Sequence, residues 1–166
     1  MKKIIIAIDS FKGCLTSAEA GKAAEKGIKS INPFCHTSVI PIADGGEGLL
    51  DVLITATKGK YITLSAHGPL MKMAKTHYGL SGNGRTAIIE MAAISGLPLV
   101  PIEQRNPMLT TTFGTGELIK DALNKGCRNF IIGIGGSATN DAGLGMLQAL
   151  GFRFLDKSGH TLGTGG

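Results

Sequence analysis

Three polar, glycine-bearing segments of this 166-residue chain gather the residue types that could do chemistry. Asp9–Gly13 holds a carboxylate, a hydroxyl and an ammonium group within five residues. Asp44–Gly48 places a carboxylate beside glycines, which let the backbone approach a ligand closely. Gly133–Asp141 combines glycines with hydroxyl, amide and carboxylate side chains. This combination favours phosphoryl transfer, which depends on positioning and charge stabilisation more than on a special nucleophile.

The main residues of these segments also have structural interpretations. Lys12 could reach phosphate oxygens, or it could extend into solvent from a capped turn. Asp44 stands where a general base or a metal ligand would stand, whereas Glu47 is more typical of a partner for a helix dipole. Asp141 would repel a bare pyrophosphate, so its position makes more sense with Mg²⁺ present.

Other polar residues give weaker signals. Glu90 is an acid among apolar neighbours and is more typical of an exposed or paired carboxylate than of a catalyst. Thr110–Thr112 offer hydroxyls that could equally cap the helix that follows. Cys14 has no neighbouring histidine and is interpreted as a small packed residue. The four histidines form no nucleophile arrangement, and we assign them no role.

The residues between these segments predict the elements that position them. Ile4–Ile8 is a β-branched run, typical of a strand buried on both faces of a parallel sheet. Thr16 and Glu19 form a capping-box pattern that opens a helix. His36–Ala43 predicts a second strand, and apolar residues at helical spacing from Leu49 predict a second helix.

The central part of the chain has a different pattern of apolar residues and glycines. Short strands with glycine-rich turns, typical of antiparallel pairing, are predicted over 61–67, 71–80 and 86–91. Beyond them we expect a helix over 116–125, a strand over 129–133, a helix from Ser137 to about Leu150 and a strand over 152–156.

This order predicts an α/β fold: a Rossmann-like, three-layer parallel sheet with an antiparallel, β-rich second subdomain. Residues 1–60 and 96–166 would form the parallel domain, and 61–95 would belong to the second domain. The three polar segments would then share the carboxyl edge of the parallel sheet, where ligands bind. Because the sequence stops in a glycine turn after a predicted strand, we expect it to be truncated.

Composition argues against several classes of function. The net charge of +5 comes from scattered basic residues, and tryptophan is absent, so a nucleic-acid-binding surface with stacking platforms is not expected. The three cysteines lie far apart, which argues against a structural zinc site and fits reduced thiols in the cytoplasm. The apolar run that ends before Asp9 is too short for a signal peptide, and no segment is long enough to span a membrane.

Five motifs resemble the bacterial glycerate kinase family, the type-1 glycerate kinases, and they occur in the family's order. They are Asp-Ser-Phe-Lys-Gly at 9–13, Ala-Asp-Gly-Gly-Glu-Gly at 43–48, Ile-Glu-Met-Ala at 89–92, Thr-Phe-Gly-Thr-Gly-Glu-Leu-Ile at 112–119 and Gly-Ile-Gly-Gly-Ser-Ala-Thr-Asn-Asp at 133–141. The resemblance implies phosphorylation of D-glycerate to 2-phosphoglycerate with ATP and Mg²⁺, and an active site between two domains. The product 3-phosphoglycerate stays open. Family members are longer, so their C-terminal part is expected to be missing here.

We infer the site residues from this chemistry. Catalytic roles are expected for Asp9, Lys12, Asp44 and Asp141. Nucleotide contacts are expected from Ser10, Gly45, Gly46, Gly135, Gly136, Ser137, Thr139 and Asn140. Asp44 or Asp141 would orient the glycerate hydroxyl or hold Mg²⁺, and Asp9 would take whichever role remains. Lys12 would neutralise charge on the transferring phosphoryl group. The oligomeric state is not predicted.

Other functions compete with this one. Gly133-x-Gly135-x-x-Ala138 also matches a dinucleotide fingerprint, with Asp156 roughly 20 residues further on, as in a nicotinamide-dependent dehydrogenase. Binding of NADH would support that alternative, and a preference for Mg-ATP would exclude it. The non-enzyme alternatives are a basic nucleic-acid-binding module and an inactive kinase fragment.

Overall fold

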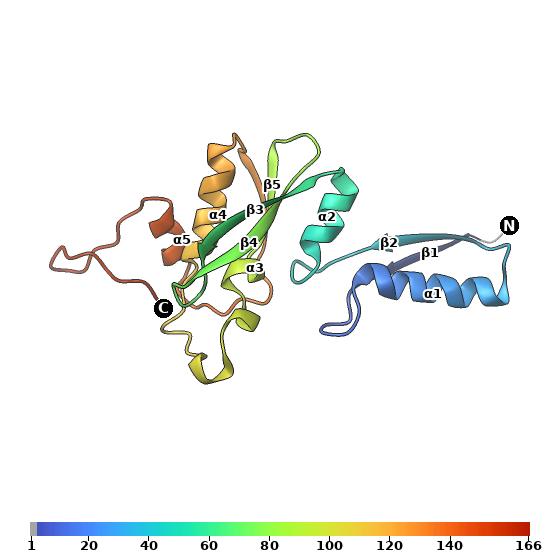
Figure 1. Ribbon diagram of the computed structural model, residues 1–166, viewed down its shortest axis with the longest axis horizontal. Helices are drawn as coiled ribbons and strands as arrows, with labels where there is room; N and C mark the ends of the chain where they lie inside the picture. The colour runs from blue at the N-terminus through green and yellow to red at the C-terminus, as the bar shows by residue number, and fades with distance from the viewer. Residues whose placement is uncertain (1–2) are drawn as a thin grey trace.

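A computed structural model describes residues 3–166 of the chain. Two structural units follow one another along its longest axis (Figure 1). In chain order the elements are β1 (Lys3–Ile8), α1 (Ser17–Ile31), β2 (His36–Pro41), α2 (Leu49–Thr57), β3 (Lys60–His67), β4 (Met73–Leu80), β5 (Thr86–Glu90), α3 (Ala92–Ser95), the 3-10 turns η1 (Leu97–Leu99) and η2 (Ile102–Gln104), α4 (Phe113–Asn124), β6 (Asn129–Gly133) and α5 (Leu144–Ala149).

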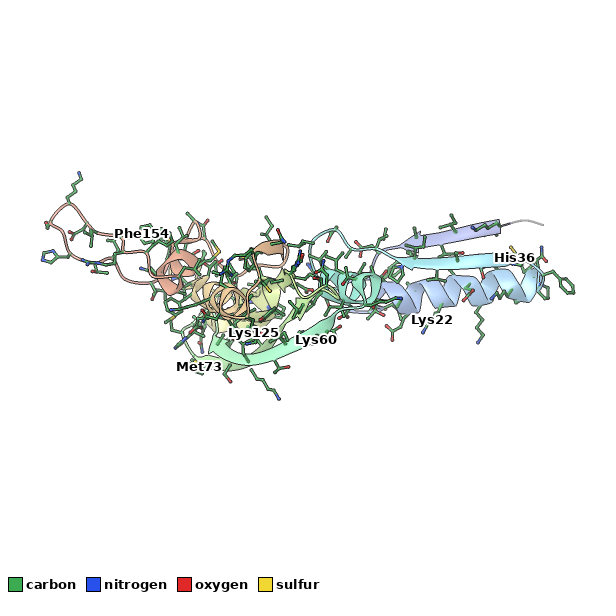
Figure 2. All side chains as sticks on the ribbon, turned by 90° about the horizontal axis from the view of Figure 1, so that it is seen from above. Lys22, His36, Lys60, Met73, Lys125 and Phe154 are labelled. Carbon is green, nitrogen blue, oxygen red and sulfur yellow. The ribbon has the colours of Figure 1, made fainter. Side chains whose placement is uncertain are left out.

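The first unit is a βαβ arrangement in which β1 and β2 pair in parallel. Helix α1 packs against the pair from one side (Figure 2), where its Gly21 lies so close to Val39 that a Cβ would meet that side chain at 2.4 Å. The opposite face leaves Ile5 and Ile40 exposed. The predicted strand at Ile4–Ile8 is therefore confirmed, but its expected burial on both faces is wrong within residues 3–166.

Helix α1 begins with the predicted capping box. The Thr16 hydroxyl accepts the backbone N–H of Glu19, and the Glu19 carboxylate accepts the backbone N–H of Thr16 at 2.9 Å. Two otherwise unbonded donors of the first helical turn are satisfied in this way. The helix start thus follows from local sequence alone.

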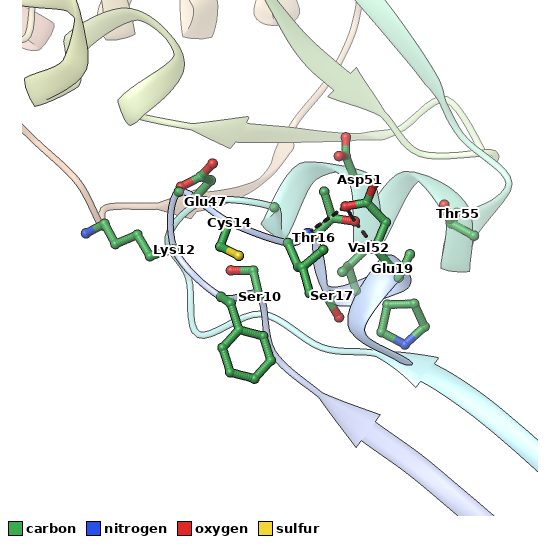
Figure 3. A pocket seen from close by; sticks show the side chains of 16 residues that line it. Ser10, Lys12, Cys14, Thr16, Ser17, Glu19, Glu47, Asp51, Val52 and Thr55 are labelled. Atoms are coloured by element: carbon green, nitrogen blue, oxygen red, sulfur yellow. Dashed lines mark hydrogen bonds between the residues drawn. The ribbon is translucent and has the colours of Figure 1, made fainter. Parts of the chain in front are cut away.

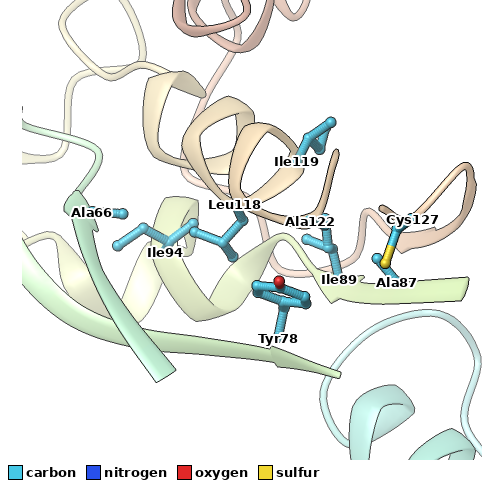
Figure 4. Close-up of a cluster of buried hydrophobic side chains, with 9 residues drawn as sticks. All are labelled: Ala66, Tyr78, Ala87, Ile89, Ile94, Leu118, Ile119, Ala122 and Cys127. Carbon is cyan, nitrogen blue, oxygen red and sulfur yellow. The ribbon is translucent and has the colours of Figure 1, made fainter. Parts of the chain in front are cut away.

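The second unit is a three-layer arrangement around a four-stranded sheet in the order β3-β4-β5-β6. Pairing is antiparallel from β3 to β5, whereas β5 and β6 are parallel. On one face α4 packs over a core that includes Tyr78, Ile89 and Leu118 (Figure 4). On the other face α2 places Leu50 and Ile54 against Ile88. The buried run in β5 thus supplies side chains to both layers, which confirms the predicted α/β class and its mixture of parallel and antiparallel pairing.

The sheet pairing differs from our expectation for the third loop-bearing strand. We predicted that Asn129–Gly133 would share a sheet with the strands at 4–8 and 36–43, but β6 pairs with β5. Strand β5 is the most buried strand of the second unit, and its free edge accepts β6. This pairing also crosses the predicted division between 61–95 and 96–166, and that division stays a prediction.

Two predicted elements near the end of the sequence are wrong. The helix expected from Ser137 begins only at Leu144, and the residues between them form an irregular loop that ends in a turn at 142–143. The strand expected over 152–156 is reduced to a single bridge between Leu155 and Thr161. Within residues 3–166, the helices are all too short or too polar to cross a membrane.

Candidate active site

A cavity of about 670 Å³ lies where the loops after β1, β2 and β6 meet. Its volume is in the range of small-molecule sites. Eight of the twelve predicted site residues line it: Asp9, Ser10, Lys12, Asp44, Gly46, Gly135, Gly136 and Ser137. The three polar segments therefore converge as the sequence predicted, although their strands belong to two different sheets.

The glycines of two loops hold these loops together. The backbone N–H of Gly135 donates to the carbonyl of Gly45 at 3.1 Å. A Cβ at Gly135 would lie 2.6 Å from the Cα of Gly46, a distance that side chains do not tolerate. Close loop packing thus requires glycine at position 135, whether or not a ligand approaches it. Gly45 contributes through its carbonyl and lies outside the cavity lining.

Ser17 ties the first loop to the second. Its hydroxyl donates to the carbonyl of Ile8 at 2.6 Å and accepts the N–H of Ile42 at 3.0 Å. These contacts fix the ends of β1 and β2 beside each other. Asp9 and Asp44, which follow these strand ends, therefore enter the same cavity.

The two predicted carboxylates that line the cavity, Asp9 and Asp44, are each held by one local hydrogen bond. One oxygen of Asp9 accepts the N–H of Ser10 at 2.6 Å, and one oxygen of Asp44 accepts the N–H of Gly46 at 3.0 Å. No other donor from residues 3–166 bonds to either carboxylate. Each group therefore has a fixed orientation and an oxygen left for a ligand.

Glu90 is a cavity residue that sequence reasoning set aside. It ends β5, and its carboxylate accepts the N–H of Leu50 in the first turn of α2 at 3.3 Å. Burial raises the pKa of the Glu90 carboxyl above its ordinary value of 4.5, and the backbone N–H groups that bond it act in the opposite direction. The parallel pairing of β5 with β6 brings it beside the glycine loop, and that pairing is not visible in local sequence.

A substitution of Glu90 tests this burial. Because the folded pKa is raised, the folded state binds more protons than the unfolded state, and stability falls as pH rises from about 4.5 through the folded pKa. Glu90→Gln keeps an acceptor for Leu50 but cannot ionise. We therefore expect urea unfolding to find variant and parent similarly stable at pH 4 and the variant more stable at pH 7. If the stability difference between variant and parent were the same at pH 4 and pH 7, the raised pKa of Glu90 would be contradicted.

Three further residues of the cavity carried no sequence signal: Asp51, His77 and Arg105. The hydroxyl of Tyr61 donates to Asp51 at 2.5 Å, and this bond, together with burial and the negative charges nearby, raises the pKa of Tyr61 to about 12. Arg105 is anchored by donation from its Nε to the carbonyl of Val100 at 3.3 Å. Arg105 thus provides a second cationic side chain in the cavity lining, besides Lys12.

Asp141 occupies a different place from the one we predicted. Its side chain is 2% exposed, does not line the cavity and is surrounded by donors of its own chain. Its carboxylate accepts the backbone N–H and hydroxyl of Thr112, the hydroxyl of Thr111 and the N–H groups of Gly143 and Gly145. This carboxylate fastens the start of α5 to the start of α4, so the geometry favours a positioning role over the catalytic and metal roles.

The neighbours of Asp141 in the sequence also lie outside the cavity lining. Thr139 and Asn140 do not line the cavity, and the Thr139 hydroxyl bonds to that of Ser137 at 2.8 Å. The hydroxyls of Thr110–Thr112 are buried and bonded within the protein. Residues 3–166 contain no group of three or more His, Cys, Asp or Glu side chains that could hold a metal ion.

The structure lacks two features that a dinucleotide site requires. A glycine fingerprint must open a helix directly, but α5 starts seven residues after Ser137. The acid that binds the ribose must end the next strand, but Asp156 lies in a turn and accepts the N–H groups of Ser158 and His160. The fingerprint at 133–138 is therefore not used as in a dehydrogenase.

A second cavity of about 360 Å³ adjoins the first (Figure 3). It lies between the loop after β1 and the helix α2, and its walls include Phe11, Leu15 and Val52. The two cavities have Lys12 and Asp51 in common. The larger cavity therefore carries more of the charged side chains, and the smaller one adds apolar side chains.

Comparison with known proteins supports the kinase interpretation. The family described as Glycerate kinase family matches residues 4–166. The chain belongs to the glycerate kinase family. It is 56% identical to a glycerate kinase of Bacillus subtilis over 164 residues and 51% identical to a glycerate 2-kinase of Escherichia coli over 164 residues. A glycerate kinase 2 structure from Salmonella typhimurium LT2 is 49% identical and superimposes with a TM-score of 0.85.

The alignments cover almost the whole of this chain, but they cover only part of each relative. Each of the two curated relatives aligns with 99% of this chain and with 43% of its own length. The Salmonella structure aligns with 99% of this chain and 44% of its own. The chain thus spans less than half the length of the relatives it matches.

Proposed function

We propose that this chain supplies the substrate-binding loops of a glycerate kinase, which phosphorylates D-glycerate from ATP with Mg²⁺. The observation that carries the proposal is the convergence of the loops after β1, β2 and β6 on one cavity. The names of the relatives favour glycerate as the acceptor, and the name of the Escherichia coli relative favours the 2-position. The cytoplasm is the proposed location.

The charges around the cavity fit a nucleotide that arrives with a divalent cation. Five carboxylates line it, against two cations: Asp9, Asp44, Glu47, Asp51 and Glu90 face Lys12 and Arg105. Glycerate and phosphate groups are anions, so they need added positive charge to enter such a site. Mg²⁺ is usually held by one or two carboxylates together with substrate phosphates, which fits a site without a larger ligand cluster. Asp9 is the residue we propose to hold it, and Asp44 is left to act on glycerate.

The protein's own contribution is to orient and neutralise the reactants. ATP with Mg²⁺ supplies the phosphoryl group and part of the charge neutralisation when bound. The ammonium of Lys12 offsets negative charge on the phosphates, and Gly136 and Ser137 line the same cavity. Because one Asp44 oxygen is occupied by Gly46, its other oxygen is the one that orients the glycerate hydroxyl and receives its proton.

Release of ADP tests the proposal. We define the joined enzyme as this chain fused to the part of the Bacillus subtilis glycerate kinase that it leaves unmatched. We expect the joined enzyme to release ADP from ATP and Mg²⁺ only when D-glycerate is added, and NMR of the product to show phosphate on the 2-position. A 3-phosphate would correct the position. Absence of glycerate-dependent release, with the fold verified by circular dichroism, would contradict the proposed activity.

A further inference from the structure

The smaller cavity is a defined compartment beside the proposed phosphate site. The wall between the two is formed by the same residues on both sides: Ser10, Lys12, Glu47, Gly48 and Asp51. Figure 3 shows that Lys12 and Glu47 lie at one end of the smaller cavity and Thr55 at the other. A ligand with its charged end at Lys12 can therefore extend its remaining part into this compartment.

The outer wall of the compartment is a turn with a fixed backbone. Phe11 and Leu15 exchange backbone hydrogen bonds of 2.8 and 3.0 Å, and the N–H of Cys14 donates to the carbonyl of Phe11 at 2.7 Å. Gly13 adopts φ +70°, a conformation that L side chains rarely take. The turn is thus held in shape by its own main chain.

The side chains on this turn are apolar but not buried. Phe11 is 54% exposed and Leu15 is 40% exposed, although both line the cavity. On the inner side, Val52 of α2 and Pro41 at the end of β2 add further apolar surface. A fixed turn that carries a half-exposed aromatic ring beside a concave wall with apolar side chains has the form of a binding slot.

Several polar side chains of the slot are already bonded within the protein or can adapt to a ligand, and Lys12 and Glu47 place charge at the shared wall. Thr16 and Glu19 bond each other in the capping box, and Asp51 accepts from Tyr61. The hydroxyls of Ser10 and Thr55 can donate or accept hydrogen bonds. The slot therefore suits a flat, mainly apolar group with a polar edge.

We propose that the smaller cavity receives the nucleobase of the nucleoside triphosphate, with Phe11 as its stacking surface. This inference rests on the proposed kinase function. Every carbon of glycerate carries oxygen, so glycerate has no apolar part to bury, whereas the base of the nucleotide is planar and stacks readily on aromatic rings. With the base in the slot, the phosphates reach the shared wall at Lys12 and the larger cavity beyond it.

The absence of tryptophan from the chain provides a direct test. Phe11→Trp places a single fluorescent residue in the slot, on a position that is half exposed and tolerant of the larger ring. We expect adenosine, which carries no phosphate, to quench this emission to saturation, and inorganic phosphate to leave it unchanged. The matched control is Phe34→Trp, which is 88% exposed and outside both cavities, and should show no saturable response.

A substitution that narrows the slot distinguishes adenosine bound in the slot from adenosine bound elsewhere on the protein. Val52→Phe narrows the slot from the side of α2, so in the F11W background it should shift the adenosine titration to higher concentration or abolish it. If F11W does not fold, Leu15→Trp reports from the same wall. Absence of saturable quenching from both reporters, or quenching that V52F leaves unchanged, would overturn the nucleobase assignment. Turnover of the joined enzyme is measured separately, so failure of the kinase function would be distinguished from failure of this inference.

Discussion

Replacement of Asp44 by Asn is expected to lower turnover of the joined enzyme by about 10²–10⁴-fold, the range typical of a lost general base. The amide oxygen of Asn can still accept the N–H of Gly46, so the loop keeps its hydrogen bond. What is lost is the negative charge and the oxygen that would receive the glycerate proton. The midpoint of thermal unfolding should therefore change little. Steady-state ADP release and circular dichroism measure the two effects.

Asp156→Asn is the matched control for this variant. Asp156 also accepts backbone N–H groups within a turn, but it lies outside both cavities. The same chemical change there should leave turnover unaltered. A normal rate for Asp44→Asn would remove Asp44 from the mechanism, and an equal loss in both variants would point to a general effect of the substitution.

Asp141→Asn, unlike Asp44→Asn, is expected to lower the stability of the fold. The carboxylate is buried and accepts from Thr111, Thr112, Gly143 and Gly145. The substitution replaces one carboxylate oxygen by an NH₂ group, which is a donor and faces the donors that bonded that oxygen. These buried donors are left without partners, and the free energy of unfolding falls by about 3 kcal/mol. In a protein of this size that corresponds to a fall of about 6–12 °C in the unfolding midpoint.

Thermal unfolding of the chain itself measures this loss, with Asp156→Asn again as the reference. The exposed Asp156 turn should lose much less stability than the buried Asp141 network. If Asp141→Asn unfolded at the parent temperature while the joined enzyme lost its turnover, Asp141 would belong to the catalytic site, as its sequence motif suggested.

Local signals in the sequence were sufficient for much of the fold. The capping box at Thr16 and Glu19 fixes the start of α1, because both partners lie within one helical turn. The β-branched run at Ile4–Ile8 and the apolar run at Asn129–Gly133 each form the expected strand. These elements depend on residues a few positions apart, so their positions can be predicted from a single chain.

Elements that depend on distant partners could not be predicted in this way. The late start of α5 follows from the contacts of Asp141 with Thr111 and Thr112, about 30 residues away, which hold the segment before α5 in a non-helical conformation. The pairing of β6 with β5 follows from an edge created by the antiparallel strands before it. Neither contact leaves a periodic pattern in the sequence.

The residues of the candidate site likewise fall into those predicted from local motifs and those that depend on contacts distant in sequence. The glycine-bearing loops were recognisable because motif and chemistry lie within a few residues, and eight of their predicted residues line the cavity. Glu90 and Arg105 were missed because their neighbours in space are far from them in sequence. Glu90, for example, reaches the N–H of Leu50 across 40 residues.

The central claim is that the loops after β1, β2 and β6 form one nucleotide-binding cavity. The most direct test is a titration of the ¹⁵N-labelled chain with ADP and Mg²⁺, observed in its ¹H–¹⁵N spectrum. Saturable shifts are expected at the backbone N–H groups of Ser10, Gly46, Gly136 and Ser137, with no comparable shifts at Asp156 and its turn. Shifts confined to residues outside the cavity, or no saturable shifts at all, would contradict the claim.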